Sequence, residues 1–170
     1  MLNFRKAAPE DLPGILTVVS QARAFMASLG IDQWQDGYPS SEILSEDIRV
    51  GRAYVHDGGG AIASICVLTS EHEPVYDAID GAWHVCEPCM TLHRMAVDDA
   101  HRHSGLAADI LKNVLDLARR QGLRGLRADT HRENVAMRRF LEKNGFQFCG
   151  VVSYPVQAGD PLRAAYDRAL

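Results

Sequence analysis

The sequence predicts an α/β fold in which helices cover the faces of a mixed β-sheet. Three observations lead to this prediction. Apolar runs of strand length recur along the chain, as in residues 61–68. Other segments, above all residues 107–118, space their apolar side chains by three or four residues, as an amphipathic helix does. The Gly-rich spacer at residues 57–60 separates two strand-like runs, 52–56 and 61–69, and is typical of a β-hairpin turn.

Length and composition narrow the class of protein. The 170 residues fit one domain with a single core, so we predict one domain over residues 1–170. A formal net charge of -4 disfavours a nucleic-acid partner, because phosphate binding needs an excess of Lys and Arg. The sequence has neither a signal-peptide core nor an apolar run long enough to span a membrane. With only four cysteines, we expect a cytoplasmic protein without a disulfide framework.

The first elements follow from local signals. Residues 2–7 are predicted as a strand. Pro and two acids at the start of residues 9–29 favour a helix there, because Pro suits the first helical turn and acids favour a helix N-terminus. A loop over residues 31–40 follows, and Ser41 is expected to cap a short helix that runs to Arg49. The predicted hairpin comes next.

The second half alternates strands and helices. Residues 70–88 are expected to be irregular, and a long helix opens at Arg102 and ends before Gly122. The other predicted elements are a strand over 90–97, a strand over 123–129, a helix over 134–143, and strands over 146–152 and 163–168. The predicted order is β-α-α-β-β-β-α-β-α-β-β.

The junction between the strand at residues 92–97 and the long helix has the features of an anion-binding site. A helix start leaves backbone N–H groups unpaired and carries a partial positive charge. Gly105 allows a phosphate to approach the backbone, and the small Ala107 keeps the first turn uncrowded. Arg102 and His103 add positive charge in an otherwise acidic chain.

Two motifs at this junction and beyond it resemble those of the GNAT acetyltransferase superfamily. The first is the hexapeptide at residues 102–107. The second is a helix that starts at Asn134 and ends in Glu-Lys-Asn-Gly-Phe at residues 142–146. Upstream, residues 32–39 and 81–83 are similar to small bacterial members. The resemblance covers nearly the whole chain and implies the GNAT acyl-CoA N-acyltransferase fold.

The resemblance also implies acetyl-CoA as the cofactor. It assigns the pyrophosphate to the backbone amides of the hexapeptide, and the pantetheine arm to the strand that precedes it, paired like an added strand. Asn134 is expected near the thioester, and it also suits a helix cap. The implied cofactor-binding residues are Met95, Ala96, Val97, Arg102, His103, Ser104, Gly105, Leu106, Ala107 and Asn134.

His93 is the preferred candidate for the catalytic base. It lies four residues before Val97 on the predicted strand, so strand alternation predicts that it shares a face with Met95 and Val97. A histidine with the ordinary pKa of about 6.5 accepts a proton at neutral pH. The position is similar to that of a catalytic histidine within the family, although a structural hydrogen bond would also explain it. Glu87, acting through water, is the alternative base.

The acid that protonates the departing thiolate is left open. Many members of the family place a tyrosine for this purpose at the position of Leu141. Here that tyrosine is missing, so Tyr154, Tyr166, Cys149 or water remain as candidates.

The acceptor pocket is expected, by family architecture, between the loop after the first helix and the end of the central strand. Trp34, Asp36, Tyr38 and Trp83 are its expected lining, because aromatic faces with a carboxylate suit a cationic amine. Burial of both tryptophans in the core is the alternative.

The pair Cys86 and Cys89 lacks the second pair of cysteines that a zinc site would need, so we expect free thiols and no metal.

Three functions remain open from the sequence. The preferred one is direct transfer of acetyl from acetyl-CoA to a primary amine in a ternary complex. The others are acetylation of a protein N-terminus or lysine, and a coenzyme A-binding sensor without catalysis, which the loss of tyrosine at Leu141 favours. The expected partner is a small-molecule or peptide amine. Dimerisation is common in such folds, but the sequence carries no signature specific to a homodimer.

Overall fold

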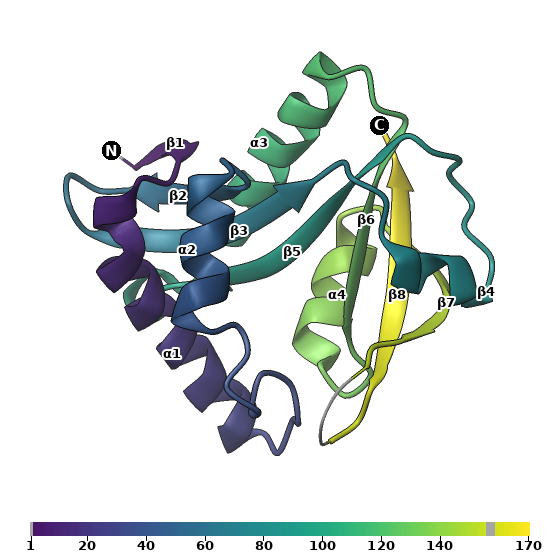
Figure 1. Cartoon of the computed structure of the whole chain (residues 1–170), viewed down its shortest axis with the longest axis horizontal. Coiled ribbons are helices and arrows are strands. Elements are labelled where there is room, and N and C mark those ends of the chain that lie inside the picture. The colour runs from purple at the N-terminus through teal and green to yellow at the C-terminus, as the bar shows by residue number, and fades with distance from the viewer. Residues whose placement is uncertain (1, 156–158) are drawn as a thin grey trace.

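A mixed sheet that opens in its middle organises the chain (Figure 1). The computed structural model describes residues 2–155 and 159–170. Within them the strand order is β1-β2-β3-β5-β6-β8-β7-β4. The strands are β1 (Asn3–Lys6), β2 (Ala53–Asp57), β3 (Ile62–Thr69), β4 (Asp80–Gly81), β5 (Cys89–Val97), β6 (Gly125–His131), β7 (Gln147–Ser153) and β8 (Leu162–Ala169).

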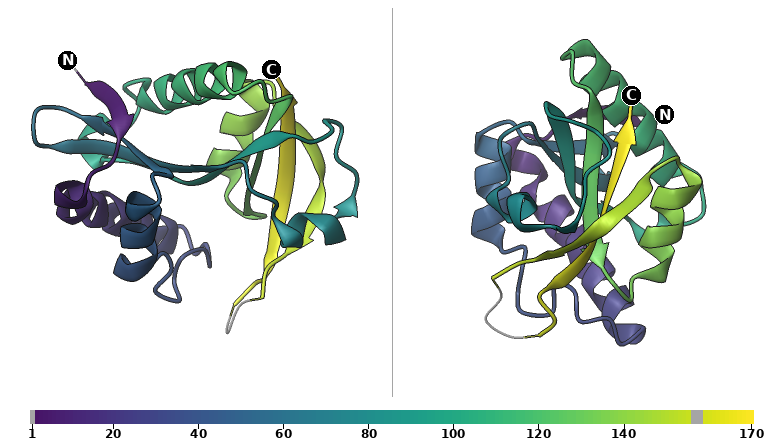
Figure 2. Two further views of the ribbon diagram at one scale, coloured as in Figure 1. Left: turned by 45° about the horizontal axis from the view of Figure 1, so that its top comes forward. Right: turned by 90° about the vertical axis from the view of Figure 1, so that its right-hand side faces the viewer.

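Helices cover both faces of this sheet (Figures 1 and 2). The helices are α1 (Leu12–Ser28), α2 (Ser41–Arg49), α3 (Leu106–Arg120) and α4 (Val135–Lys143), with 3-10 turns at Pro9–Asp11, Pro74–Ala78 and Asp99–His101. Residues such as Ile15, Leu44 and Ile65 form one core between α1, α2 and the sheet. Ile110 and Leu126 belong to the second core, under α3 and α4. In the described residues, no helix has both the length and the apolar character to cross a membrane.

The predicted fold class is confirmed, with three local differences. The segment predicted as irregular contains β4, which pairs with β7 where Gly81 and Gly150 bring their backbones too close for a Cβ on either residue. Strand β4 has only two residues, one of them glycine, and so short a segment carries no alternating pattern, so the sequence did not indicate this strand. Ser40, not Ser41, caps α2, since its Oγ accepts the Ile43 N–H at 3.3 Å. Helix α3 begins at Leu106 rather than at residue 102.

The sheet opens because two parallel strands part after four residues. Strand β5 pairs with β6 only along residues 89–92 and 125–128. Beyond that point β5 stays paired with β3, whereas β6 stays paired with β8. A bulge in β5 lies at the same level: Ile65 faces Ala96 and Val67 faces His93, so one residue of β3 opposes two of β5. Bulges bend a strand and interrupt regular pairing, and here the result is a wedge between β5 and β6.

Candidate active site

The loop before α3 presents backbone N–H groups that are free to bind an anion. His103 and Gly105 adopt positive φ angles of 61° and 89°. The N–H groups of His103, Gly105 and Ala107 have no hydrogen-bond acceptor among the described residues. A Cβ at Gly105 would meet no atom within 4 Å. Positive φ, and not crowding, therefore requires glycine here, and the space in front of the loop is open to a ligand.

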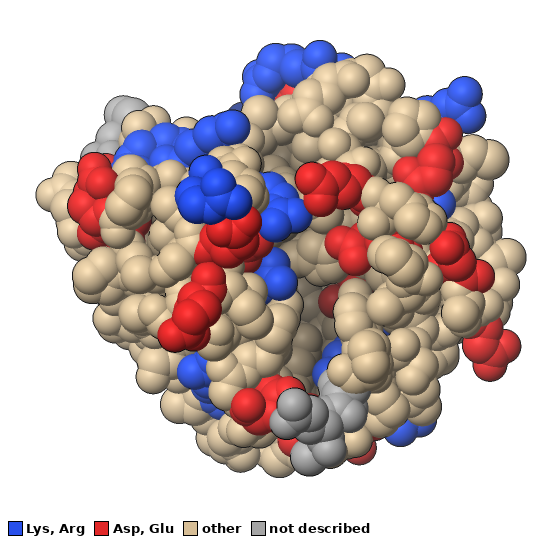
Figure 3. Space-filling view, viewed as in Figure 1, with Lys and Arg blue, Asp and Glu red and all other residues tan. Residues whose placement is uncertain are grey.

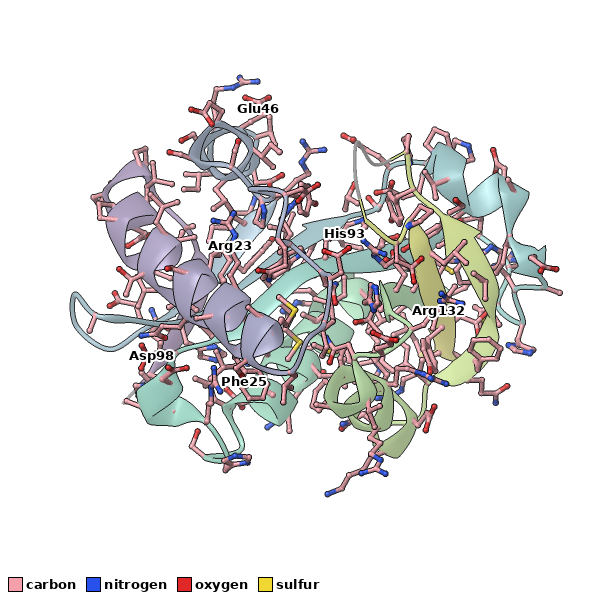
Figure 4. All side chains as sticks on the ribbon, turned by 90° about the horizontal axis from the view of Figure 1, so that it is seen from below. Arg23, Phe25, Glu46, His93, Asp98 and Arg132 are labelled. Atoms are coloured by element: carbon pink, nitrogen blue, oxygen red, sulfur yellow. The ribbon has the colours of Figure 1, made fainter. Side chains whose placement is uncertain are left out.

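The side chains of this loop are held by the protein itself. The Arg102 guanidinium lies 4.1 Å above the ring of Phe25 and pairs with Asp99 at 2.6 Å. The Ser104 hydroxyl donates to the carbonyl of His101 at 2.6 Å. Phe25 of α1 lies beside the loop that starts near Asp98 (Figure 4). These contacts hold the side chains of Arg102 and Ser104 within the protein, whereas three backbone N–H groups of the loop have no acceptor among the described residues.

Beyond the bulge, β5 has an unpaired edge on the side of β6. The pairing with β6 ends at Leu92, so the backbone of Met95, Ala96 and Val97 has no strand partner on that side within the described residues. The Asp98 N–H donates to Ala63 of β3 at 2.9 Å. Because N–H groups alternate along a strand, the N–H of Val97 points towards the open edge. Such an edge can accept an extended ligand as an added strand.

The predicted face of His93 is wrong. The bulge at Arg94, where φ is 51°, adds one residue and reverses the alternation of side chains along β5. Met95 and Val97 therefore pack against the core under α3. His93 lies on the opposite face, where it lines a pocket, and Figure 4 shows it near the middle of the molecule.

His93 is paired with a carboxylate that the sequence did not single out. Its Nε2 lies 2.9 Å from Oε1 of Glu73, and its side chain is 18% exposed. The hydrogen bond with His93 lowers the pKa of the Glu73 carboxyl. Glu73 therefore stays ionised and orients the imidazole ring towards the pocket.

A pocket of about 430 Å³ occupies the wedge between β5 and β6. Figure 3 shows a hollow between the two halves of the molecule, with acidic and basic side chains along it. Trp34, Asp36 and Tyr38 line this pocket together with His93, as expected from the sequence. The other lining residues are Gln33, Asp47, Arg52, Val67, Thr69, Glu73, Arg94, Asp129, Tyr154, Pro155 and Arg163.

Two arginines hold the most buried carboxylate of the pocket. Asp47 lies 2.9 Å from Nη1 of Arg94 and 3.7 Å from Nε of Arg52. Burial raises the pKa of the Asp47 carboxyl, and the two guanidinium groups oppose that shift. The Arg94 guanidinium also lies 5.2 Å from the ring centre of Tyr38. This network joins α2 and the loop before it to strands β2 and β5.

Two phenols, that of the buried Tyr76 and that of the half-buried Tyr154, contact the carboxylate of Asp129. The hydroxyls of Tyr76 and Tyr154 both donate to Oδ2 of Asp129, at 2.7 and 2.9 Å. Burial, and then the charge of Asp129, raises the pKa of both phenols, so each keeps its proton at neutral pH. Tyr154 also lines the pocket.

The comparison with known families identifies the chain. A model of the acetyltransferase (GNAT) family matches residues 22–146. The chain belongs to the GNAT acetyltransferase family. It is therefore an acyltransferase that moves an acetyl group to an acceptor, and the resemblance noted in the sequence is confirmed.

Solved GNAT structures agree with this assignment. A GNAT-family acetyltransferase from Streptococcus agalactiae 2603 is 35% identical, covers 99% of this chain and 95% of its own, and has a TM-score of 0.86. One from Listeria monocytogenes 4b F2365 is 19% identical over 99% of this chain and 95% of that one, with a TM-score of 0.72. PaiA N-acetyltransferase from Thermoplasma acidophilum, in complex with coenzyme A, is 15% identical over 100% and 99%, with a TM-score of 0.72. The last two share the fold. No curated protein matches the chain.

The Asn134 of the second GNAT motif is a helix cap in this chain. Its Oδ1 accepts the N–H of Met137 at 3.1 Å at the start of α4. Its Nδ2 donates to Oε1 of Gln33 at 3.2 Å, and the same oxygen lies 3.3 Å from the Thr130 hydroxyl. Gln33 therefore ties the loop after α1 to β6 and α4, across the wedge of the GNAT sheet.

Two predicted site residues of this GNAT enzyme lie elsewhere. Trp83 does not line the pocket: its Nε1 donates to the carbonyl of Tyr76 at 3.1 Å, and the Arg127 guanidinium lies 4.3 Å above its ring. Glu87 forms an ion pair with Arg127 and accepts the N–H of Cys89, at the start of β5. These contacts hold Glu87 outside the lining of the pocket that contains His93, which does not favour Glu87 as the base.

The remaining acid candidates are also separated from the pocket. The hydroxyl of Tyr166 is bonded to Arg138 and Glu142 beneath α4. Cys149 lies beside His84, and burial raises the pKa of its thiol to about 12. Its Sγ also lies close to Asp167, as one of three potential metal ligands. Cys86 is exposed and Cys89 is buried, and the thiol of Cys89 donates to backbone carbonyls. Of the four candidates for the acid that protonates the thiolate (Tyr154, Tyr166, Cys149 and water), only Tyr154 and water are left at the pocket.

We predict that Arg94→Met lowers the free energy of unfolding by about 3 kcal/mol at pH 7.5, because it leaves the buried Asp47 without its nearer counter-ion. The folded state already raises the pKa of Asp47, and the substitution raises it further. A carboxyl with a raised folded pKa loses stability as pH rises, so the deficit should shrink towards pH 5. Urea unfolding of the wild type and of Arg94→Met at pH 5 and pH 7.5 measures the difference in their free energies of unfolding.

Arg49→Met is the control for this prediction, because Arg49 is 72% exposed and, among the described residues, pairs only with Glu46. It should change stability by no more than about 0.5 kcal/mol. A deficit for Arg94→Met that is equal at pH 5 and pH 7.5 would show that the charge of Asp47 is not its cause.

Proposed function

We propose that this GNAT enzyme transfers acetyl from acetyl-CoA to a primary amine, by direct attack in a ternary complex. One observation carries the proposal: the wedge between β5 and β6 joins a free backbone edge to a pocket that holds a His–Glu pair. The four cysteines are free thiols, which fits an enzyme of the reducing cytoplasm.

The described residues fit acetyl-CoA. The unpaired N–H groups of His103, Gly105 and Ala107 would bind its pyrophosphate at the N-terminus of α3. The open edge at Met95–Val97 would bind its pantetheine arm. When bound, acetyl-CoA supplies an acetyl group activated as a thioester.

The chain's own residues would then handle the protons. His93 accepts a proton from the substrate ammonium, and Glu73 stabilises the imidazolium that results. The neutral amine attacks the thioester carbon, so that an N–C bond forms and the C–S bond breaks. The N–H of Val97 donates to the carbonyl oxygen as negative charge develops there. The acetylated nitrogen would lose its extra proton while the departing thiolate gains one, and Tyr154 or water at the pocket would relay that proton.

The pocket favours a small acceptor over a protein. The loop that carries Trp34, Asp36 and Tyr38 closes one side of it, and Gln33 ties that loop to β6 and α4. The pairing of His93 with Glu73 and the presence of Tyr154 beside the pocket also favour catalysis over a sensor that only binds coenzyme A.

We expect acetyl-CoA at 100 times its dissociation constant to raise the melting temperature by about 5 °C or more. Gly105→Glu should abolish this shift, because it blocks the anion loop with a carboxylate. Gly122→Glu is the matched control: Gly122 also has a positive φ, of 69°, and a Cβ there meets no atom within 4 Å, but it lies at the other end of α3. No shift in the wild type, or equal shifts in both variants, would contradict the cofactor site.

We also expect His93→Ala to lower kcat by about 100-fold and to leave the acetyl-CoA melting shift unchanged, because it removes the base and not the cofactor site. His72→Ala serves as the control, since His72 is exposed and Asp77 is its only ion-pair partner in the part of the chain that the structure describes. Steady-state rates with saturating acetyl-CoA and an amine acceptor measure the effect. Wild-type turnover in His93→Ala across the pH range would exclude His93 as the base.

A further inference from the structure

Asp129 lines the pocket, and one of its two carboxylate oxygens has no donor among the described residues. Both tyrosine hydroxyls donate to Oδ2, and no described residue donates to Oδ1. No described cation lies within ion-pair distance of Asp129, which lines the pocket. Neutral phenol donors leave the negative charge of Asp129 uncompensated, so the pocket offers an anionic group to a ligand.

Arg163 supplies the opposite charge in the same pocket. Its Nη1 donates to the backbone carbonyls of Asp160 and Leu162, at 2.6 and 2.9 Å. Its Nε and Nη2 donate to no described residue, and it forms no ion pair with a described carboxylate. These two N–H groups form one edge of the planar guanidinium, and that edge matches a carboxylate in a bidentate fashion.

The two free groups share one face of the sheet. Asp129 of β6 lies opposite Ala165 of β8, and Arg163 lies two residues from Ala165, opposite His131. Residues two apart on a strand point to the same face, so Asp129 and Arg163 are diagonal neighbours, about 7 Å apart at their backbones. Burial and then the nearby Arg163 charge lower the pKa of His131, in keeping with this position.

The other charged groups of the pocket already have partners or lie at its edge. Asp47 is paired with Arg94 and Arg52, and Glu73 with His93. Asp36, the remaining carboxylate, is exposed and accepts the N–H of Tyr38 at 3.2 Å. One anion and one cation are thus left for a ligand to neutralise within the pocket.

We propose that the acceptor is a small zwitterion of the amino-acid class, whose ammonium group binds Oδ1 of Asp129 and whose carboxylate binds Nε and Nη2 of Arg163. This inference rests on the proposed acetyl transfer and names its substrate class. The ammonium held by Asp129 is the group that loses a proton to His93 and is acetylated. A ligand with only one of the two charges leaves the other site group without a counter-ion, which costs binding energy.

The test is a panel of L-α-amino acids, each compared with its own carboxamide, which keeps the amine and loses the negative charge. With acetyl-CoA, the wild type should favour the best acid over its carboxamide by about 10- to 100-fold in kcat/KM, as expected for a charge-assisted pair. Arg163→Gln should bring the ratio close to one, mainly by raising KM for the acid. Arg163→Lys keeps the charge and should retain part of the preference.

Arg168→Gln is the matched control, because Arg168 lies on the same strand, on the opposite face, and does not line the pocket. It should keep the wild-type ratio. Wild-type acetylation of carboxamides or simple amines as efficiently as of any acid, or an unchanged ratio in Arg163→Gln, would overturn the inference and leave acetyl transfer intact.

Calorimetric titration of the same panel, in the presence of coenzyme A, separates the two proposals. Binding of an amino acid that Arg163→Gln and Asp129→Asn each weaken, without acetyl transfer, would support the zwitterion site and reject the proposed reaction. Neither binding nor transfer with any acid, alongside transfer to other amines, would reject the zwitterion site alone.

Discussion

The separation of β5 from β6 after Leu92 is the constraint on which the rest of the site depends. Four residue pairs between β5 and β6 join the two halves of the sheet. Beyond them β5 pairs only with its antiparallel neighbour β3, and β6 with β8. A continuous sheet would have hydrogen-bonded the edge of β5 and filled the space between the strands. Because the strands part, the β6-side edge of Met95–Val97 has no strand partner among the described residues, and a pocket forms next to it.

The bulge at Arg94 turns this opening into a chemical site. The extra residue lets Met95 and Val97 return to the core under α3, while His93 and Arg94 both face the pocket. Without it, either the histidine or the apolar side chains of β5 would lie on the wrong face. The bulge interrupts the regular pairing of β5 with β3. In return, one strand packs apolar side chains into the core and also presents polar side chains to the pocket, and bulges are common next to active sites for this reason.

Some charged side chains of the pocket have counter-ions within the protein and others do not, and this difference indicates where a charged ligand could bind. Most carboxylates are neutralised within the protein, as Asp47 is by two arginines. Asp129 and Arg163, both half-buried, have no counter-ion among the described residues. Departures of this kind tend to occur where a ligand completes the structure, because a stable core without function would have removed them.

The sequence by itself determined the fold class, the order of the helices and of every strand except β4, and the family, because these depend on local signals. A glycine with positive φ, a helix start and apolar periodicity act over a few residues and are legible along the chain. Tertiary structure alone decided the face of His93, since the bulge arises from the register between β3 and β5. It also placed Glu73 beside His93, paired Glu87 with Arg127, and kept Trp83 out of the pocket lining. The contact between His93 and Glu73 joins residues 20 positions apart, and no local pattern encodes which of several carboxylates a folded strand will face.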